Sequence, residues 1–265
     1  MSFYGTAGEL FQEHGESNCD NRVNLCCTAG SKRVRSPGLG APRIAGAPAR
    51  SYLSGVADKA CRIPPTFHAS RFMHNLNLAL FSALNAGAAP HAIVARIAIF
   101  AADWLVYALP AMLLMTWIFG ERSTRRQAVE ASVGACVALA LAQALGHVWF
   151  SPRPFMAGVG TQLIPHAPDS SFPSDHMTFA WSIAVGLLLG STTRVTGYVM
   201  AAMAVSIAWG RVYAGVHWPF DMAGGVLVGT AGALAAHLYG ERVTEPLERI
   251  GDVVHAVMMG RERAP

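Results

Sequence analysis

Long apolar runs constrain this chain more than any other feature of its sequence. The stretch from Ile93 to Gly120 is interrupted only by Arg96 and Asp103. A helix of about 20 apolar residues crosses the hydrocarbon core of a bilayer, where the backbone has no water to bind. Because 52% of the residues are hydrophobic and only 14% are charged, similar runs recur along the chain. We therefore expect a membrane protein rather than one large soluble domain.

The apolar segments predict an all-α fold, a polytopic helical bundle with about five transmembrane helices. Asn75 to Leu84 is amphipathic but too short to cross, so it predicts an N-terminal helix in the membrane interface. Pro110 predicts a kink in the first span. Glu241 to Arg263 alternates charged and apolar residues and predicts a surface helix. The expected spans cover residues 93–119, 127–149, 174–190, 195–210 and 217–239.

Residues 1–72 differ in composition from the rest. They carry nine basic and five acidic residues and four of the five cysteines, whereas the charges from Met73 onward cancel. This segment offers too little apolar surface to fold alone and has no apolar core of a signal peptide. We expect a disordered extension, or upstream sequence added by a misassigned start with Met73 as the working first residue. The membrane domain is then 73–240, and a cytoplasmic helix and tail fill 241–265.

Arginines in the short loops predict the orientation, because positive residues accumulate on the cytoplasmic side. The opposite loops, 150–173 and 210–217, should then face outward, and every candidate catalytic residue falls there. We expect the bacterial inner (plasma) membrane, with the active site facing the periplasm or the outside. The arginines that place their loops in the cytoplasm are Arg122, Arg125, Arg126, Arg194 and Arg242.

His217 and Asp221 have the spacing of an oriented nucleophile. If a helix begins near His217, Asp221 lies one turn further along on the same face. A carboxylate beside an imidazole fixes the tautomer and leaves the other ring nitrogen free to attack. The alternative is a histidine at the lipid–water boundary with a chance acidic neighbour.

Three clusters of residues stand out and include groups that suit a phosphate: Arg153-Pro154, the stretch from Phe172 to His176, and Arg211 with His217 and Asp221. Ser174 is a good N-cap, and a helix start offers unpaired N–H groups to an anion. His176, in that first turn, could donate a proton to a leaving oxygen. Arg153 and Arg211 could bind phosphate in a bidentate way, or could instead snorkel to lipid head groups. Together these residues indicate phosphoryl transfer in which arginine neutralises the charge, with no metal and no cofactor.

In order and spacing, the three clusters resemble the signature motifs of the type 2 phosphatidic acid phosphatase superfamily. The stretch from Asp169 to His176 and the start from Asn75 to Phe81 resemble the BcrC-type undecaprenyl-diphosphate phosphatases, which are linked to bacitracin resistance. The resemblance covers roughly 73–240. It implies hydrolysis of undecaprenyl diphosphate to undecaprenyl phosphate and phosphate, a step of peptidoglycan biosynthesis. The implied partner is a lipid phosphate in the bilayer, and no nucleic acid is expected.

The resemblance also implies a role for each motif residue. His217 is the nucleophile and becomes a phosphohistidine, Asp221 orients it, and His176 is the general acid. The residues implied in binding the substrate phosphate are Arg153, Arg211, Ser174 and Asp175.

Some positions depart from the family pattern or lie outside it. The family has a lysine where this chain has Gly146 and a serine where it has Gly210. Asp103 lies in mid-span, where a carboxylate is costly, so it is either functional or a structural partner of Arg96. His166 and Asp169, in the outer loop, are further candidates for touching substrate.

Two other functions fit parts of this pattern. One is another lipid phosphatase of the same superfamily, acting on phosphatidic acid, phosphatidylglycerol phosphate or lipid A. The other is a transporter, which would spread charged residues along its spans near mid-depth. Here the charged residues cluster at one boundary, which favours an enzyme that works on a head group.

Overall fold

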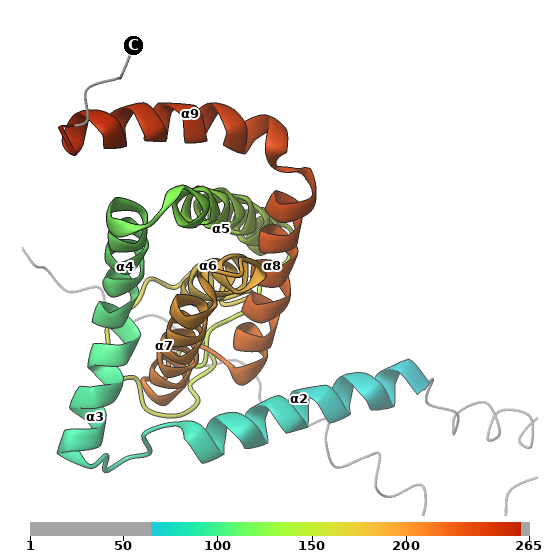
Figure 1. Ribbon diagram of the computed structural model, residues 1–265. Coiled ribbons are helices and arrows are strands. Elements are labelled where there is room, and N and C mark those ends of the chain that lie inside the picture. The colour runs from blue at the N-terminus through green and yellow to red at the C-terminus, as the bar shows by residue number, and fades with distance from the viewer. Residues whose placement is uncertain (1–64, 261–265) are drawn as a thin grey trace, which may run out of the picture. The chain divides into compact units, whose positions relative to one another are not determined.

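A computed structural model describes residues 65–260, and over this range all regular secondary structure is helical. Most of the expected extension, and any role for its cysteines, lies outside the described residues. The helices, shown in Figure 1, are α2 (Pro65–Leu84), α3 (Ala92–Ile99), the π-helical turn η1 (Phe100–Trp104), α4 (Leu105–Phe119), α5 (Arg122–Val148), α6 (Asp175–Leu189), α7 (Arg194–Tyr213), α8 (Pro219–Tyr239) and α9 (Glu241–Met258).

Four helical stretches are long and apolar enough to cross a membrane: Ala92–Phe119, α5, α7 and α8. The chain is therefore a multi-pass membrane protein. The remaining expected span is α6, which has 15 residues and a length of about 22 Å, against a hydrocarbon core of about 30 Å. Its packing against α5, α7 and α8 places it inside the bundle. A count of five membrane-spanning helices stays a prediction.

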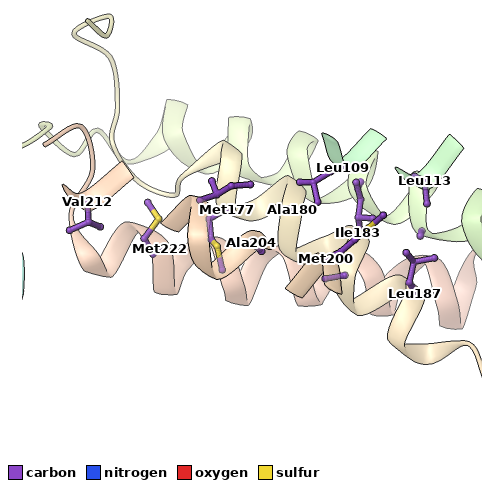
Figure 2. Close-up of a cluster of buried hydrophobic side chains, with 14 of the residues drawn as sticks. Leu109, Leu113, Met177, Ala180, Ile183, Leu187, Met200, Ala204, Val212 and Met222 are labelled. Atoms are coloured by element: carbon purple, nitrogen blue, oxygen red, sulfur yellow. The ribbon is translucent and has the colours of Figure 1, made fainter. Parts of the chain in front are cut away.

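The core forms around α6, as Figure 2 shows. Apolar side chains recur on α6 every three or four residues, and α4 and α7 pack against them. Between α5 and α8 the contact is made by small residues. A Cβ on Gly232 would lie 2.6 Å from the Cβ of Ala138, so only glycine permits this approach. The buried α6 residues labelled in the figure are Met177, Ala180, Ile183 and Leu187.

α2 lies across one end of the bundle and α9 across the other (Figure 1). The expected interfacial helix at Asn75–Leu84 ends as predicted but begins ten residues earlier, at Pro65. Proline is well tolerated in a first helical turn, and no glycine or second proline interrupts the helix from Thr66 to Leu84. The fixed part of α2 is its second half. There Asn77 Oδ1 accepts a hydrogen bond from Phe220 N (3.1 Å), and the fully buried Phe81 ring lies 5.0 Å from that of Trp218.

The first long helix departs from α-helical hydrogen bonding at Phe100–Trp104, while Pro110 lies within the regular helix α4. The π-turn contains Asp103 and packs against α7. A Cβ on Gly210 would lie 2.7 Å from the carbonyl oxygen of Ala98 and 2.8 Å from the backbone nitrogen of Ala102. No side chain fits here without moving the backbone, which accounts for glycine at this motif position.

Candidate active site

The loop that connects α5 to α6 and the turn that connects α7 to α8 meet at a cavity of about 600 Å³. Motif residues as far as 64 positions apart in sequence converge on it. The wall on the α5 side includes Gln143, Gly146, His147 and Phe150. The polar and charged residues from the loops and the other helix ends are Arg153, His166, Asp169, Ser170, Asp175, His176, Arg211 and His217.

His217 lies just before α8 rather than inside it. The helix begins two residues after the expected start at 217, because Trp218 is extended (φ −82°, ψ 153°) and Pro219 is the first helical residue. Asp221 nevertheless reaches the imidazole, since its carboxylate turns back over the helix start. Its Oδ2 accepts a hydrogen bond from Trp218 N (2.7 Å) and lies 3.3 Å from His217 Nδ1.

The imidazole of His217 is buried and held from one side. Nδ1 lies 3.0 Å from the carbonyl oxygen of Ser171 as well as near Asp221, so both acceptors favour a proton on Nδ1. Nε2 then carries the lone pair and accepts a hydrogen bond from Arg153. Arg153 Nη1 lies 3.0 Å from this nitrogen, on the side that borders the cavity. The arrangement is that of an oriented nitrogen nucleophile beside a cation.

Both motif arginines are buried, so neither snorkels to the surface. Arg153 donates from Nε to Asp169 Oδ1 (2.8 Å) and from Nη1 to the carbonyl oxygen of Val216 (2.9 Å). Arg211 donates from Nη1 to Asp103 Oδ1 (3.3 Å) and from Nη2 to His166 Nε2 (2.9 Å).

Asp103 thus has a partner other than the one expected. Its described ion pair is with Arg211 on α7, not with Arg96 on its own helix. The Nε of Arg211 is buried and has no hydrogen-bond partner among the described residues. A buried N–H without a partner is costly, so this donor is an unsatisfied group within the site.

His166, in the loop, lies near both Arg211 and His217. Its ring is 6.1 Å from that of His217, and its Nδ1 donates to the carbonyl oxygen of Ala167 (3.1 Å). Burial lowers the pKa of His166 below its usual 6.5, and the neighbouring guanidinium groups of Arg153 and Arg211 lower it further. The ring is therefore neutral at pH 7, and its Nε2 can accept the hydrogen bond from Arg211.

The residues at the start of α6 divide into two groups. Asp175 and His176 line the cavity, and Asp175 Oδ2 accepts a hydrogen bond from Gln143 (2.7 Å). Ser174 is fully buried, does not line the cavity, and accepts a hydrogen bond on its Oγ from Met177 N (3.5 Å). Its side chain caps α6. Phosphate binding by Ser174 and by Asp175 stays a prediction.

The comparisons with known proteins agree with this arrangement. Residues 127–245 match the family model of the PAP2 superfamily, and this range contains all three motif clusters. The chain is 37% identical to YbjG of Escherichia coli over 166 residues. This aligned region covers 63% of this chain and 83% of YbjG. It is 30% identical over 153 residues to the undecaprenyl-diphosphatase BcrC of Bacillus subtilis, covering 58% of this chain and 78% of BcrC.

The chain belongs to the PAP2 superfamily. It is a lipid phosphatase of that family, and the expected resemblance is confirmed. The crystal structure of Aquifex aeolicus LpxE has the same fold, with a TM-score of 0.51, 26% sequence identity, and coverage of 62% of this chain and 96% of that one.

Two features of this PAP2 site were not predicted from its sequence. Ser171 supplies a carbonyl oxygen to His217 and donates its hydroxyl to the Asp221 carboxylate. The one sequence signal for Ser171 is its position in the Asp169–Phe172 stretch. Its contacts with His217 and Asp221 could not be predicted, because they depend on the path of the loop. The second feature is the link from Asp103 to Arg211, which depends on the π-turn. Within residues 65–260, no three His, Cys, Asp or Glu side chains gather as they would around a metal ion.

Proposed function

We propose that this PAP2 enzyme hydrolyses undecaprenyl diphosphate to undecaprenyl phosphate and inorganic phosphate through a phosphohistidine on His217. The observation that carries the proposal is the setting of this imidazole. Its Nδ1 is held by Ser171 and Asp221, and its Nε2 lies beside Arg153 at a cavity that also contains Arg211. The similarity to BcrC of Bacillus subtilis supports the choice of lipid.

In the first step, His217 Nε2 attacks the terminal phosphorus. A nitrogen–phosphorus bond forms, and the bond from that phosphorus to the bridging oxygen breaks. His176, which lines the same cavity, protonates the departing lipid monophosphate. Nδ1 keeps its proton, and the Asp221 carboxylate stabilises the positive charge that the ring gains during attack.

In the second step, water attacks the phosphohistidine. His176, now neutral, accepts a proton from that water, and inorganic phosphate leaves as the nitrogen–phosphorus bond breaks. His176 and His217 return to their starting protonation states, so the proton balance of the reaction closes without a metal or cofactor.

The arginines supply the positive charge that this reaction requires. Arg153 Nη1 exchanges its contact with His217 for a phosphate oxygen, and Arg211, which lines the same cavity, adds a second guanidinium group. Both guanidinium groups are buried, where charge-assisted hydrogen bonds are stronger than in water. Catalysis here rests on placing positive charge where the transferring phosphoryl group develops negative charge.

The substrate's polyprenyl tail reaches the cavity along α5. Beside the cavity wall this helix exposes apolar side chains, among them Leu141, Leu145 and Val148. The tail can stay against them in the bilayer while the diphosphate enters the cavity. A phosphate monoester is a better leaving group than the alcohol released from phosphatidic acid. An easier leaving group also suits a site with Gly146 in place of the family's lysine.

The active site faces the periplasm or the outside. Arg122, Arg125, Arg126, Arg194 and Arg242 all lie at the end of the bundle opposite the cavity, and such residues favour the cytoplasm. A cysteine placed in the loop 156–168 should react with an impermeant thiol label in intact cells. If that cysteine is protected in intact cells but reacts fully after lysis, the orientation is the reverse of the one proposed.

The purified full chain tests the reaction itself. Phosphate release is measured from undecaprenyl diphosphate and from phosphatidic acid, each with and without EDTA. We expect a higher kcat/KM for undecaprenyl diphosphate and no effect of EDTA. A preference for phosphatidic acid would assign the enzyme to the general lipid phosphatases, and activity that disappeared in EDTA and returned with Mg²⁺ would overturn the mechanism.

A further inference from the structure

A second group of cavities lies at the opposite end of the bundle, where α9 crosses it (Figure 1). α8 starts beside the active site and ends at Tyr239, about 31 Å further on, and α9 begins two residues later. α9 is fixed to the end of α4. There His255 Nε2 lies 2.9 Å from the carbonyl oxygen of Ile118, and its ring packs edge-on against Trp117.

The first of these cavities, of about 320 Å³, is lined by charged residues. Asp252 pairs with Arg125 (3.0 Å) and Arg122 (3.2 Å), and Glu248 pairs with Arg126 (3.3 Å). Three arginines thus meet two carboxylates, which leaves one positive charge in excess. The side chains of Arg122 and Arg126 are 85% and 52% exposed, so both can reach an anion.

Two apolar cavities share the lining residues Trp117 and Val129 with this charged one, so the three are neighbours. One, of about 250 Å³, lies between α4 and α5 and is lined by residues such as Leu113 and Ala128. The other, of about 580 Å³, lies between α5 and α9 and is lined by residues such as Val133, Leu247 and Val254. The positively charged cavity, which we call the charged mouth, therefore adjoins two apolar grooves.

The depth of these cavities matches a membrane boundary. The arginines follow the turn between two long apolar helices, whereas Leu113 and Val133 lie within those helices. α9 leaves Ile250, Val253 and Val257 exposed, as a helix lying in the interface would. The charged mouth thus lies at head-group level and the grooves at acyl-chain level.

We infer that this end of the protein binds an anionic phospholipid of the bilayer, which is not its substrate. The phosphate pairs with Arg122 and Arg126, and the two acyl chains occupy the two grooves. Basic pockets between membrane helices bind anionic head groups in this way. A general attraction of α9 to anionic lipid is not the cause, because α9 carries four acidic residues and only two arginines.

Native mass spectrometry tests the site without any measurement of activity. The full chain is taken from bilayers that contain phosphatidylglycerol and phosphatidylcholine with the same acyl chains. We expect about one phosphatidylglycerol retained per chain. The variant Arg122→Gln/Arg126→Gln should retain it at least fivefold less often. The matched control Arg194→Gln/Arg242→Gln removes two exposed arginines from the same end, neither of which lines the cavities, and should behave as the wild type.

A second variant tests the grooves separately from the charges. Cys136 is exposed and lines the groove under α9, so Cys136→Trp should fill it and lower retention with every arginine in place. Equal loss in both arginine variants would show general surface attraction and overturn the site. So would equal retention of the two lipids, or a stable dimer of the chain that forms in place of the lipid complex.

Discussion

At the residue scale, the Asp221 carboxylate is shared between the fold and the site. It accepts hydrogen bonds from Ser171 Oγ and Trp218 N and lies against His217 Nδ1. The same group therefore starts α8, fastens the loop that precedes α6 and orients the imidazole. An amide at this position could keep the shape of the network, but it would place a donor where an acceptor is needed.

Asp221→Asn should lower kcat on the order of 10²- to 10⁴-fold, because the ring loses its acceptor and the charge that balances the imidazolium. Steady-state phosphate release measures this effect, and circular dichroism checks the fold. Ser171→Ala is the matched control. It removes one donor to the carboxylate but keeps the carbonyl oxygen that holds Nδ1, so its loss should be at least tenfold smaller. Equal losses would mean that Asp221 acts mainly through the loop.

Gly146→Lys should lower KM for lipid phosphates roughly fivefold or more, because it adds a cation to the cavity wall. There is room for the side chain. A Cβ at this position would lie 3.6 Å from the carbonyl oxygen of Phe172, which is an ordinary contact. Gly146→Met has a similar length without the charge and should not lower KM. A fall in KM in both variants would assign the effect to apolar contact instead.

The motif residues that converge on the cavity could be predicted because the spacing of the three clusters, together with their resemblance to the superfamily's motifs, identifies Arg153, Arg211 and His217. The contacts of Ser171 and Asp103 could not be, because they depend on a loop path and on the packing of two helices. Ser174 shows the opposite case. Its sequence position fits both a helix cap and a phosphate ligand; the structure shows the cap, and phosphate binding stays a prediction.

At the scale of elements, the loops of the site are held by α2 and by one turn. Asn85, just after α2, donates to the carbonyl oxygens of Thr161 and Tyr213, each at 3.0 Å, and accepts from Thr161 N at 2.8 Å. Gly215, in the turn before His217, has a φ of +77°, and a Cβ there would overlap the carbonyl oxygen of Thr161.

Gly215→Ala should therefore destabilise the protein and reduce activity, since both the backbone conformation and the space exclude a side chain. Gly158→Ala is the matched control. It has a similar φ of +67° in the same region but nothing within 4 Å of a Cβ. The control should cost about 1–2 kcal/mol, and Gly215→Ala about 1–3 kcal/mol more. Chemical unfolding and turnover measure the two effects, and equal costs would show that the contact with Thr161 is unimportant.

Helix length did not decide how closely the ends could be predicted: the 15-residue α6 lies within one residue of its expected bounds, whereas the 27-residue α5 begins five residues before its expected start. The apolar pattern of α5 and α8 predicts their ends to within a few residues, because a membrane requires an unbroken apolar length. α8 starts at Pro219, two residues later than expected, because the chain is extended at Trp218. The π-turn leaves no mark in the apolar pattern, since all of its residues except Asp103 are apolar.

At the scale of the whole molecule, the two ends differ in chemistry. One end holds α2 and the catalytic cavity, and the other holds the arginines beneath α9. The anchors that fix α2 are Asn77, Phe81 and Asn85, whereas residues 72–76 are exposed. All of these anchors follow Met73, although the helix itself begins at Pro65.

A chain that starts at Met73 should therefore insert and hydrolyse lipid diphosphate within about twofold of the full chain. Membrane fractionation and phosphate release measure this. The control is a chain that starts at Pro65 and keeps all of α2. If the Met73 start fails and the Pro65 start succeeds, the first turns of α2 are needed. If both fail, the preceding residues are needed for insertion.

The central claim is that His217 carries the phosphoryl group. The full chain is mixed with undecaprenyl diphosphate labelled in its terminal phosphate, quenched rapidly under alkaline conditions, and mapped by peptide. We expect an acid-labile, base-stable label on the peptide that contains His217, and neither label nor turnover in His217→Ala. A label on another residue, or turnover retained in His217→Ala, would contradict the account.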